Sequence, residues 1–323
     1  MIISDIYNRT FKTLRVSLLN SCNLGCTYCV NEENKIKDKR LKIKDLKYGA
    51  LSYLELSKTI KKLHSILNFE TIRLTGGEPT LYKDLVPLLN DLSDLKIPMK
   101  LTTNGLLLKN SLSKLPTNVL DSINISIDAL DEEVFYKISG RRNLQKVLEG
   151  IDLAIALKIH VKLNCVVIKG VNESQILPLL KYAGKKGVTI RFLEIMKMGH
   201  LQDSAFDNAY VSENEILENI QSLYSTYKLS RNKSATANYW LTDSGIKFGI
   251  IANESEPFCH DCNRLRLDSF GNIYGCLSDN TPLNISKFLD NDLTINEILK
   301  KALAQKQPLK FKGSGLSMLE IGG

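Results

Sequence analysis

Hydrophobic residues in the first two thirds of the chain recur with two different periods. Runs in which every second residue is apolar predict strands, and longer runs with apolar residues three and four apart predict helices. We expect strands at 14–18, 71–75, 99–103, 119–128, 160–168 and 188–195. We expect the main helices at 43–67, 85–92, 144–157 and 176–183. This alternation indicates parallel βαβ units, and six units predict an incomplete (β/α)6 version of the eight-unit barrel.

The periodicity changes after about residue 200. A helix with acidic residues in its first turns is expected at 211–227, followed by short strands at 239–251 in a different, antiparallel layer. We therefore predict two parts in this α/β chain. They are a partial barrel at 1–205 and a C-terminal α+β region at 206–323.

Composition is ordinary for a large globular chain, with 323 residues of which 43% are hydrophobic. Charged residues are mixed into the segment 1–13, which argues against a signal peptide or a membrane span, so we expect a cytoplasmic protein. Disulfides are hard to keep there, and six of the seven cysteines fall in two tight groups, which favours metal binding. Cys165 stands alone in an apolar strand and is predicted to be a core residue.

The net charge of +8 includes a basic run made of Lys35, Lys37, Lys39, Arg40, Lys42, Lys44 and Lys47. Such a run can contact nucleic acid or a polyphosphate. Asp38 and Asp45 interrupt it, and no aromatic residues are interleaved for base stacking. A solvated surface is therefore the favoured interpretation, and a nucleic-acid partner is not expected.

Cys22, Cys26 and Cys29 form a C-x3-C-x2-C run directly after the first strand. Three thiols are one short of a closed tetrahedral site. A 4Fe-4S cluster on three thiolates leaves one iron open to a small molecule, so this spacing favours a reactive cluster. The alternatives are a zinc site completed by His64 or another distant ligand, and reduced thiols in a core.

Residues at the C-terminal ends of barrel strands are the expected site of chemistry. Gly76 and Gly77 follow the second strand, where their lack of side chains lets the backbone approach a ligand closely. Further candidates at strand ends lie at 102–105, 126–128, 162–164 and 191–196.

A second group of three thiols lies in the C-terminal part, at Cys259, Cys262 and Cys276. Structural zinc is the common interpretation of a C-x2-C pair, although His260 between the two cysteines is poorly placed to be the fourth ligand. The parallel with the first group favours a second open cluster. Arg264 and Arg266 follow at alternate positions and offer planar donors suited to phosphate oxygens.

Together these motifs resemble the GTP 3′,8-cyclase family of radical S-adenosylmethionine (SAM) enzymes, which begins molybdenum-cofactor biosynthesis. Most of the chain takes part in the resemblance, through 22–29, 73–79, 101–105, 126–130, 162–164, 191–196, 258–267 and the ending 321–323. The resemblance implies a radical SAM barrel with a C-terminal extension that carries a second iron-sulfur cluster. It also implies two 4Fe-4S clusters and SAM as cofactors, and GTP as the substrate.

The roles implied by the resemblance follow the matching positions. Cys22, Cys26 and Cys29 would hold the SAM cluster, and Cys259, Cys262 and Cys276 the second one. SAM would be contacted by Tyr28, Gly77, Ser126 and Met196. GTP would be bound by Arg15, Arg73, Thr102, Lys162, Arg191, Arg264 and Arg266. Catalysis would involve Arg15, Arg73, Arg264, Arg266 and a tail ending in Gly322 and Gly323, which enters the active site.

The implied reaction starts when a 5′-deoxyadenosyl radical removes the C3′ hydrogen of GTP. The C3′ radical then adds to C8 of guanine, which gives 3′,8-cyclo-GTP after reduction. The implied partners are an electron donor and a downstream cyclic pyranopterin monophosphate synthase, while homodimer formation stays open. No membrane partner is expected.

The chain departs from the family pattern at Thr71, at Asn20 and Ser21, at Val30 and Asn31, and at Lys197. Because these positions lie near the implied substrate, a divergent radical SAM enzyme that modifies a peptide or RNA is one alternative. Lysines of the basic run are hypothesised to restore the charge missing at Thr71. A second alternative, a non-enzymatic zinc protein that binds nucleic acid, leaves the stretch 75–79 unexplained.

Overall fold

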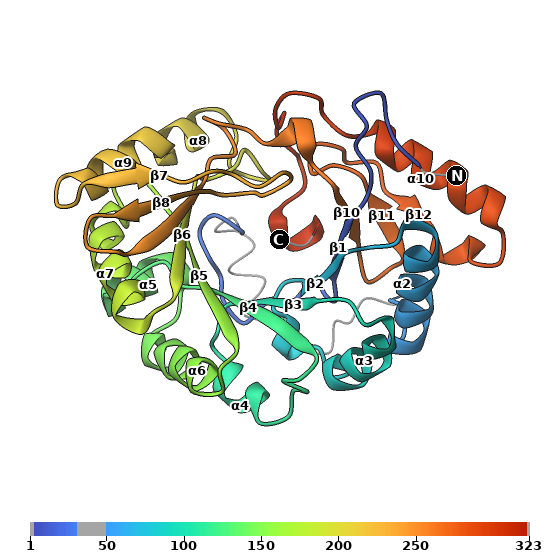
Figure 1. Ribbon diagram of the computed structural model, residues 1–323, viewed down its shortest axis with the longest axis horizontal. Helices are drawn as coiled ribbons and strands as arrows, with labels where there is room; N and C mark the ends of the chain where they lie inside the picture. Colours follow the sequence, from blue (N-terminus) through green and yellow to red (C-terminus); the bar gives the residue numbers. More distant parts are fainter. Residues whose placement is uncertain (1–2, 31–49, 322–323) are drawn as a thin grey trace.

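The computed structural model describes residues 3–30 and 50–321, and within them one twelve-stranded sheet curves around a central space (Figure 1). The strand order is β12-β11-β10-β1-β2-β3-β4-β5-β6-β9-β8-β7. The strands are β1 (Thr13–Ser17), β2 (Thr71–Thr75), β3 (Met99–Thr103), β4 (Leu120–Ser126), β5 (His160–Val166), β6 (Thr189–Leu193), β7 (Thr226–Lys228), β8 (Asn238–Thr242), β9 (Lys247–Ile251), β10 (Arg264–Leu267), β11 (Asn272–Tyr274) and β12 (Leu283–Asn284).

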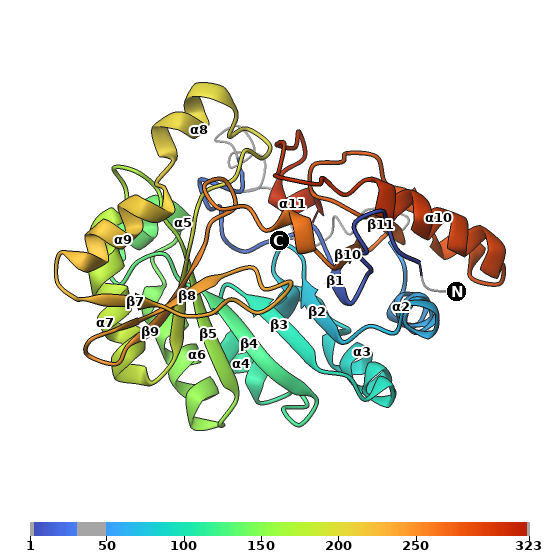
Figure 2. The same cartoon turned by 45° about the horizontal axis from the view of Figure 1, so that its top comes forward.

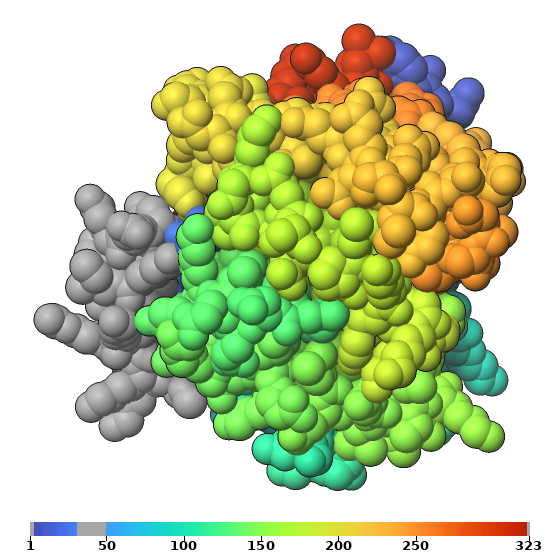
Figure 3. All heavy atoms as spheres, turned by 90° about the vertical axis from the view of Figure 1, so that its left-hand side faces the viewer, coloured from blue at the N-terminus to red at the C-terminus, as the bar shows by residue number. Residues whose placement is uncertain are grey.

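Helices lie outside the sheet (Figures 1 and 2), and Figure 3 shows part of their outer face as a closely packed surface. They are α2 (Tyr53–Leu67), α3 (Leu85–Leu92), α4 (Leu108–Leu112), α5 (Glu132–Ser139), α6 (Leu144–Ala156), α7 (Ile176–Lys186), α8 (Asp203–Ala209), α9 (Glu213–Gln221), α10 (Asp292–Ala304) and α11 (Met318–Ile321). The short helix α11 is the exception, because it lies inside the ring of strands. In the described ranges, each helix is too short or too polar to span a bilayer.

Local sequence explains where several helices begin and end. Ser52 caps α2 by accepting a hydrogen bond from the backbone of Glu55, whose side chain bonds back to the Ser52 backbone. Ser212 and Glu215 form the same capping box at α9. Asn68 ends α2 in the left-handed conformation, with a φ of 50°.

Alternation along each strand separates the core from the central cavity. In β2, Ile72 and Leu74 have no exposed surface and belong to the hydrophobic core under the helices. Thr71, Arg73 and Thr75 alternate with them and line the cavity on the other face. The period of two thus places polar side chains inside the barrel and apolar ones outside it.

Strands β1 to β6 pair in parallel, which confirms the predicted partial barrel. Two C-terminal strands extend it, because β10 pairs in parallel with β1 and β9 pairs in parallel with β6. The prediction of a different layer for residues 239–251 is therefore wrong, although the antiparallel pairing expected there is confirmed, since β8 is antiparallel to both β7 and β9. The edge of β6 is completed by β9, whose Phe248 and Ile250 are fully buried beside the β6 residues that they pair with.

The helix expected at 211–227 is also shorter than predicted. It ends at Gln221, and Tyr227 lies in β7, where it pairs with Leu241 of β8. Pairing with a neighbouring strand overrides the apolar spacing that suggested a longer helix. The part of the expected helix 43–67 that precedes residue 50 lies outside the described residues. The division into 1–205 and 206–323 stays a prediction.

Candidate active site

A cavity of about 1010 Å³ lies inside the curved sheet. It brings together every predicted site residue in the described part of the chain. These are Arg15, Cys22, Cys26, Tyr28, Cys29, Arg73, Gly77, Thr102, Ser126, Lys162, Arg191, Met196, Cys259, Cys262, Arg264, Arg266 and Cys276. The predicted tail residues Gly322 and Gly323 lie outside the described residues, as does the basic run at 35–47.

Strand register places the two cysteine groups at opposite ends of the parallel strands. The group that begins at Cys22 follows the C-terminal end of β1. β10 runs parallel to β1 with Arg264 beside Thr13, so Cys262 precedes β10 at the N-terminal end. β11 is antiparallel to β10 and returns Cys276 to that same end. The space between the two groups is the interior of the barrel.

The Gly-Gly turn after β2 packs against the segment that leads into the first cysteine group. The backbone N–H of Gly77 donates to the carbonyl of Leu19 at 2.7 Å, and that of Glu78 donates to Ser21 at 2.9 Å. A Cβ at Gly77 would lie 2.1 Å from the Ser21 carbonyl oxygen. Glycine is needed here because the two backbones are too close for a side chain.

Glu78 ties this turn to the end of β3. Its fully buried carboxylate accepts hydrogen bonds from the hydroxyl of Thr103 at 2.6 Å and from the backbone of Asn104 at 2.7 Å. The backbone of Thr80 donates at 3.0 Å. Burial raises the pKa of Glu78, while these donors oppose the rise. Asn104 in turn places its side-chain amide 3.6 Å from the sulfur of Cys22.

A second buried carboxylate orients Tyr28. The hydroxyl of Tyr28 donates to one carboxylate oxygen of Asp128 at 2.8 Å. The backbone N–H of Val166 donates to the other oxygen, also at 2.8 Å. Burial raises the pKa of Asp128 to about 6. Ser126, the last residue of β4, lines the cavity nearby, as does Met196 beyond β6.

The thiols of the first group are free cysteines in surroundings that disfavour their ionisation. Burial and the charge of Glu78 raise the pKa of Cys22 to about 11. Burial raises the pKa of Cys29 to about 12, with contributions from Cys22 and Asp128. The pKa of Cys26 is raised well above its usual value, mainly by burial.

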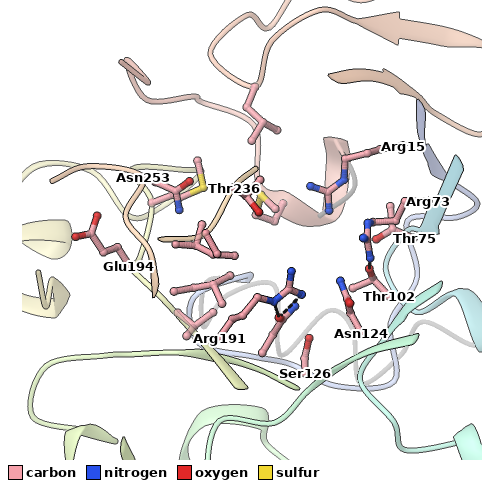
Figure 4. A pocket seen from close by; sticks show the side chains of 18 of the residues that line it. Arg15, Arg73, Thr75, Thr102, Asn124, Ser126, Arg191, Glu194, Thr236 and Asn253 are labelled. Carbon is pink, nitrogen blue, oxygen red and sulfur yellow. Dashed lines mark hydrogen bonds between the residues drawn. The ribbon is translucent and has the colours of Figure 1, made fainter. Parts of the chain in front are cut away.

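Between the two cysteine groups, cationic side chains form a belt across neighbouring strands. Arg266, Arg15 and Arg73 stand side by side in register on β10, β1 and β2. Figure 4 shows Arg15, Arg73 and Arg191 approaching the same space from different strands. Arg73 donates to the hydroxyl of Thr102 at 3.3 Å, which connects the belt to β3. The belt as a whole consists of Arg15, Arg73, Lys162, Arg191, Arg264 and Arg266.

Belt cations form no ion pair with any carboxylate in residues 3–30 and 50–321. The Nε atoms of Arg15 and Arg266 are buried there without a hydrogen-bond acceptor. Burial and, to a smaller extent, neighbouring cations lower the pKa of Arg73 to about 10 and that of Lys162 to about 8. Such a concentration of cations is suited to a polyanionic ligand, which would satisfy the free donors and relieve the repulsion.

Two belt residues lie deeper than the sequence predicted. Lys162 and Arg191 were expected at the C-terminal ends of strands, yet each is the third residue of its strand, in β5 and β6. Arg191 is held there by two hydrogen bonds to the side chain of Asn164, at 2.9 and 2.6 Å. Apolar runs show that a strand exists, but they do not show how much of it faces the cavity.

The second cysteine group lies among cations. Cys262 accepts hydrogen bonds on its sulfur from Arg264 and from Lys306, each at 3.3 Å. Arg9 donates to the carbonyl of Cys259 at 2.8 Å and to that of Gln307 at 2.7 Å. Burial raises the pKa of Cys262, but Lys306 and Arg264 outweigh it and lower the pKa to about 6.

The two groups of thiols fit iron-sulfur clusters. Each group faces the cavity from one end, as three cysteines that form no disulfide. In the part of the chain that the structure describes, no three Cys, His, Asp or Glu side chains converge as ligands of one metal ion. A cluster differs from a single ion in this respect, because its thiolates bind separate irons around its outside.

One departure from the family pattern, Asn31, lies outside the described residues, and the others differ in how they contact the central cavity. Thr71 and Val30 line it. Ser21 supplies the carbonyl that accepts from the Gly-Gly turn, a contact that any residue can make. The ammonium of Lys197 lies 4.7 Å from the ring centre of Phe206. Lys100 and Lys247 also line the cavity and add positive charge that the sequence did not reveal.

Sequence reasoning missed several residues that organise the site, including Asn104, Lys306 and Arg9. Lys306 follows α10 and is 6% exposed, but in the sequence it is one lysine among many. Arg9 had a weak signal, because Asp5 stands four residues earlier and binds its guanidinium at 2.6 Å. Asn104 follows a predicted strand, which marked its position but not its contact with Cys22.

Comparison with protein families gives two matches that together cover most of the chain. Residues 16–183 match the model for the radical SAM superfamily, and residues 188–311 match the model named Molybdenum Cofactor Synthesis C.

Curated relatives named GTP 3′,8-cyclase align over nearly the full length. The protein of Aquifex aeolicus is 35% identical over 328 residues, covering 99% of both chains. The protein of Staphylococcus carnosus strain TM300 is 36% identical over 306 residues, covering 93% of this chain and 88% of its own. Among solved structures, Streptococcus suis SuiB bound to S-adenosylmethionine is 15% identical with a TM-score of 0.59, over 88% of this chain and 65% of that chain. The last likeness concerns the fold alone.

Proposed function

Because the chain belongs to the GTP 3′,8-cyclase family of radical SAM enzymes, we propose that it converts GTP to 3′,8-cyclo-GTP, the first step of molybdenum-cofactor biosynthesis. The observation that carries this proposal is the belt of cations between the two cysteine groups, which has no carboxylate partner in the described part of the chain. A triphosphate supplies about four negative charges, and the belt supplies the matching donors.

Family membership implies a 4Fe-4S cluster and SAM, and we propose two clusters for this chain. Cys22, Cys26 and Cys29 would hold the first, and Cys259, Cys262 and Cys276 the second. When bound, the first cluster and SAM supply the 5′-deoxyadenosyl radical that removes the C3′ hydrogen of GTP. The free thiols and their placement at opposite ends of the cavity support this assignment.

The chain's own residues bind and orient the two small molecules. Tyr28, Gly77, Ser126 and Met196 line the end of the cavity near the first cysteine group, where SAM would lie. The cations of the belt would bind the triphosphate and so fix the position of the ribose relative to SAM. The surrounding strands and helices would exclude water from the reacting atoms.

The C-terminal tail would complete the site. Met318 and Leu319 of α11 line the cavity, which supports the proposal that Gly322 and Gly323 enter it. Glycines suit such a tail because they pass other backbone without a side-chain clash. The electron donor, the downstream cyclic pyranopterin monophosphate synthase and the cytoplasmic location are further parts of the proposal, while homodimer formation stays open.

The test is an anaerobic assay of the full chain. The protein is reconstituted with iron and sulfide, its iron is measured, and SAM, dithionite and GTP are supplied before mass spectrometry of the products. We expect about eight irons per chain, as two four-iron clusters require, with GTP-dependent formation of 5′-deoxyadenosine and an isomer of GTP. SAM cleavage that is indifferent to GTP would contradict the proposed substrate.

The same assay addresses the two alternatives that the sequence left open. A peptide- or RNA-modifying enzyme would retain eight irons and SAM cleavage but leave GTP unchanged. A non-enzymatic zinc protein is not supported, because the family matches are to radical SAM enzymes. It would bind zinc in place of iron and cleave no SAM.

A further inference from the structure

Lys306 is a buried cation outside the belt. Its ammonium has three N–H donors and three protein acceptors within reach. They are the carbonyl of Arg264 at 2.9 Å, the carbonyl of Gly275 at 3.2 Å and the sulfur of Cys262 at 3.3 Å. The ammonium also lies 5.1 Å from the ring centre of Phe11. Two of its three donors are therefore used to hold it in place, and the third points at a cysteine sulfur.

The two carbonyls that hold Lys306 belong to residues beside the cysteines themselves. Gly275 precedes Cys276, and Arg264 is two residues beyond Cys262. A shift of either cysteine would therefore also move a carbonyl that orients the ammonium. This arrangement fixes the distance between charge and sulfur more firmly than a flexible surface lysine could.

Lys306 lies at this position because the end of α10 packs closely against Gly275. A Cβ at Gly275 would lie 1.6 Å from the carbonyl oxygen of Ala302, so this glycine lets the end of α10 rest directly on the strand that leads to Cys276. The side chain of Gln305 accepts from the backbone N–H of Gly275 at 2.7 Å. Arg9 holds the backbone on the other side, by donating to the carbonyl of Lys306 at 3.3 Å.

We propose that Lys306 is a positioning residue of the second cluster, whose hydrogen bond to the Cys262 sulfur raises the reduction potential of that cluster. This inference rests on the proposed second cluster. A donor on a ligand sulfur offsets the negative charge that the cluster gains on reduction, so it stabilises the reduced form more than the oxidised one. Removal of the donor makes one-electron reduction by dithionite harder.

The test isolates the second cluster in the full-length chain by changing Cys22, Cys26 and Cys29 to Ala. In this parent, and in the same chain with Lys306→Met, the midpoint potential is measured by dithionite titration followed by electron paramagnetic resonance. We expect the ratio of reduced to oxidised cluster at a fixed potential to fall about tenfold in Lys306→Met, which corresponds to about 59 mV for a one-electron couple. Lys306→Arg keeps a cationic donor and should restore most of the potential.

Lys301→Met is the matched control, because Lys301 lies on α10 with an exposed side chain. It removes the same charge without touching the cysteines and should leave the potential unchanged. An unchanged potential in Lys306→Met, with about four irons still bound, would overturn the inference and leave the proposed function standing. A parent that binds no iron would overturn the second cluster itself, and the inference with it. Iron content and spectra therefore separate the two failures.

Discussion

Around Cys22, Cys26 and Cys29, the charged side chains that influence the sulfurs are the carboxylates of Glu78 and Asp128. Around Cys262 they are the ammonium of Lys306 and the guanidinium of Arg264. The same kind of donor atom, a cysteine sulfur, is therefore given opposite electrostatic surroundings at the two ends of one cavity. The sequence shows three thiols in each group, and the structure shows that the charges around them differ in sign.

The difference also concerns how each group is held. The first group depends on backbone packing, in which Gly77 approaches Ser21 and Glu78 joins the turn to β3. The second depends on side-chain cations, Arg9 and Lys306, that bring the segment after α10 onto the cysteines.

Removal of all three thiols of one group at a time should show that the two cysteine groups have different roles. With Cys22, Cys26 and Cys29 changed to Ala, we expect loss of about four irons and of all 5′-deoxyadenosine formation. With Cys259, Cys262 and Cys276 changed to Ala, we expect the same loss of iron, SAM cleavage that persists, and no cyclised GTP. Cys165→Ala is the control, because this fully buried cysteine belongs to the core. Equal products from the two triple variants would mean that the groups do not differ in function.

A methyl group added at one glycine should reduce iron binding by one cysteine group and leave iron binding by the other unchanged. Gly77→Ala places a Cβ 2.1 Å from Ser21, and Gly275→Ala places one 1.6 Å from Ala302, so in each variant the backbone must move. We expect each to lose roughly half of the bound iron, from the first group in Gly77→Ala and from the second in Gly275→Ala. Iron analysis with electron paramagnetic resonance distinguishes the two clusters.

Gly315→Ala is the matched control for both glycine variants. The nearest atom to an added Cβ there is 3.5 Å away, which is ordinary contact, so full iron content is expected. Loss of iron from both groups in either variant would show that the two ends are mechanically coupled.

Arg15→Met should weaken GTP binding while stabilising the protein without GTP. We expect roughly 10- to 100-fold weaker binding, because one charged donor to phosphate is lost. Without ligand, removal of a cation beside Arg266 and Arg73 relieves repulsion and should raise the free energy of unfolding by about 1 kcal/mol. Calorimetric titration with GTP and thermal melting measure the two effects. Arg142→Met, at an exposed arginine, should change neither. Lower stability in Arg15→Met would mean that the belt is already neutralised without substrate.

The smallest effect is expected at Glu213, which does not line the cavity and serves as a reference for both groups. Burial and the charge of Glu256 raise its pKa to about 7, and Asn238 donates to both carboxylates. Because the pKa is raised in the folded state, its contribution to stability is greatest below the unfolded value near 4.5 and declines as the pH rises through 7.

Glu213→Gln removes this ionisation and should therefore melt about 2 °C higher than the native protein at pH 8, with no difference at pH 4. Iron content should be unchanged at either pH. A melting temperature that is equal at pH 8, or higher only at low pH, would contradict the assigned cause.

Much of the barrel could be predicted from the sequence, because strands with buried outer faces have strong apolar patterns. The strand at 71–75 was placed at its observed bounds. The cysteine groups were found because their spacing is chemically specific. The pairing of β9 with β6 was missed, since its partner lies more than fifty residues away and no local pattern reports it. Lys306 and Glu78 were missed in their roles because a buried charge is recognised only by its partners.

The pairing of β9 with β6 and of β10 with β1 affects how the protein folds during synthesis. Strands β1 to β6 are complete by Leu193, yet the described strands that cover the two edges of that sheet, β9 and β10, lie within residues 247–267 and are synthesised later. Open edges of this kind add strands from other chains, so a nascent chain stalled in this interval is expected to aggregate. The closed sheet that keeps water from the radical chemistry therefore depends on contacts between strands far apart in the sequence. Such long-range contacts form slowly.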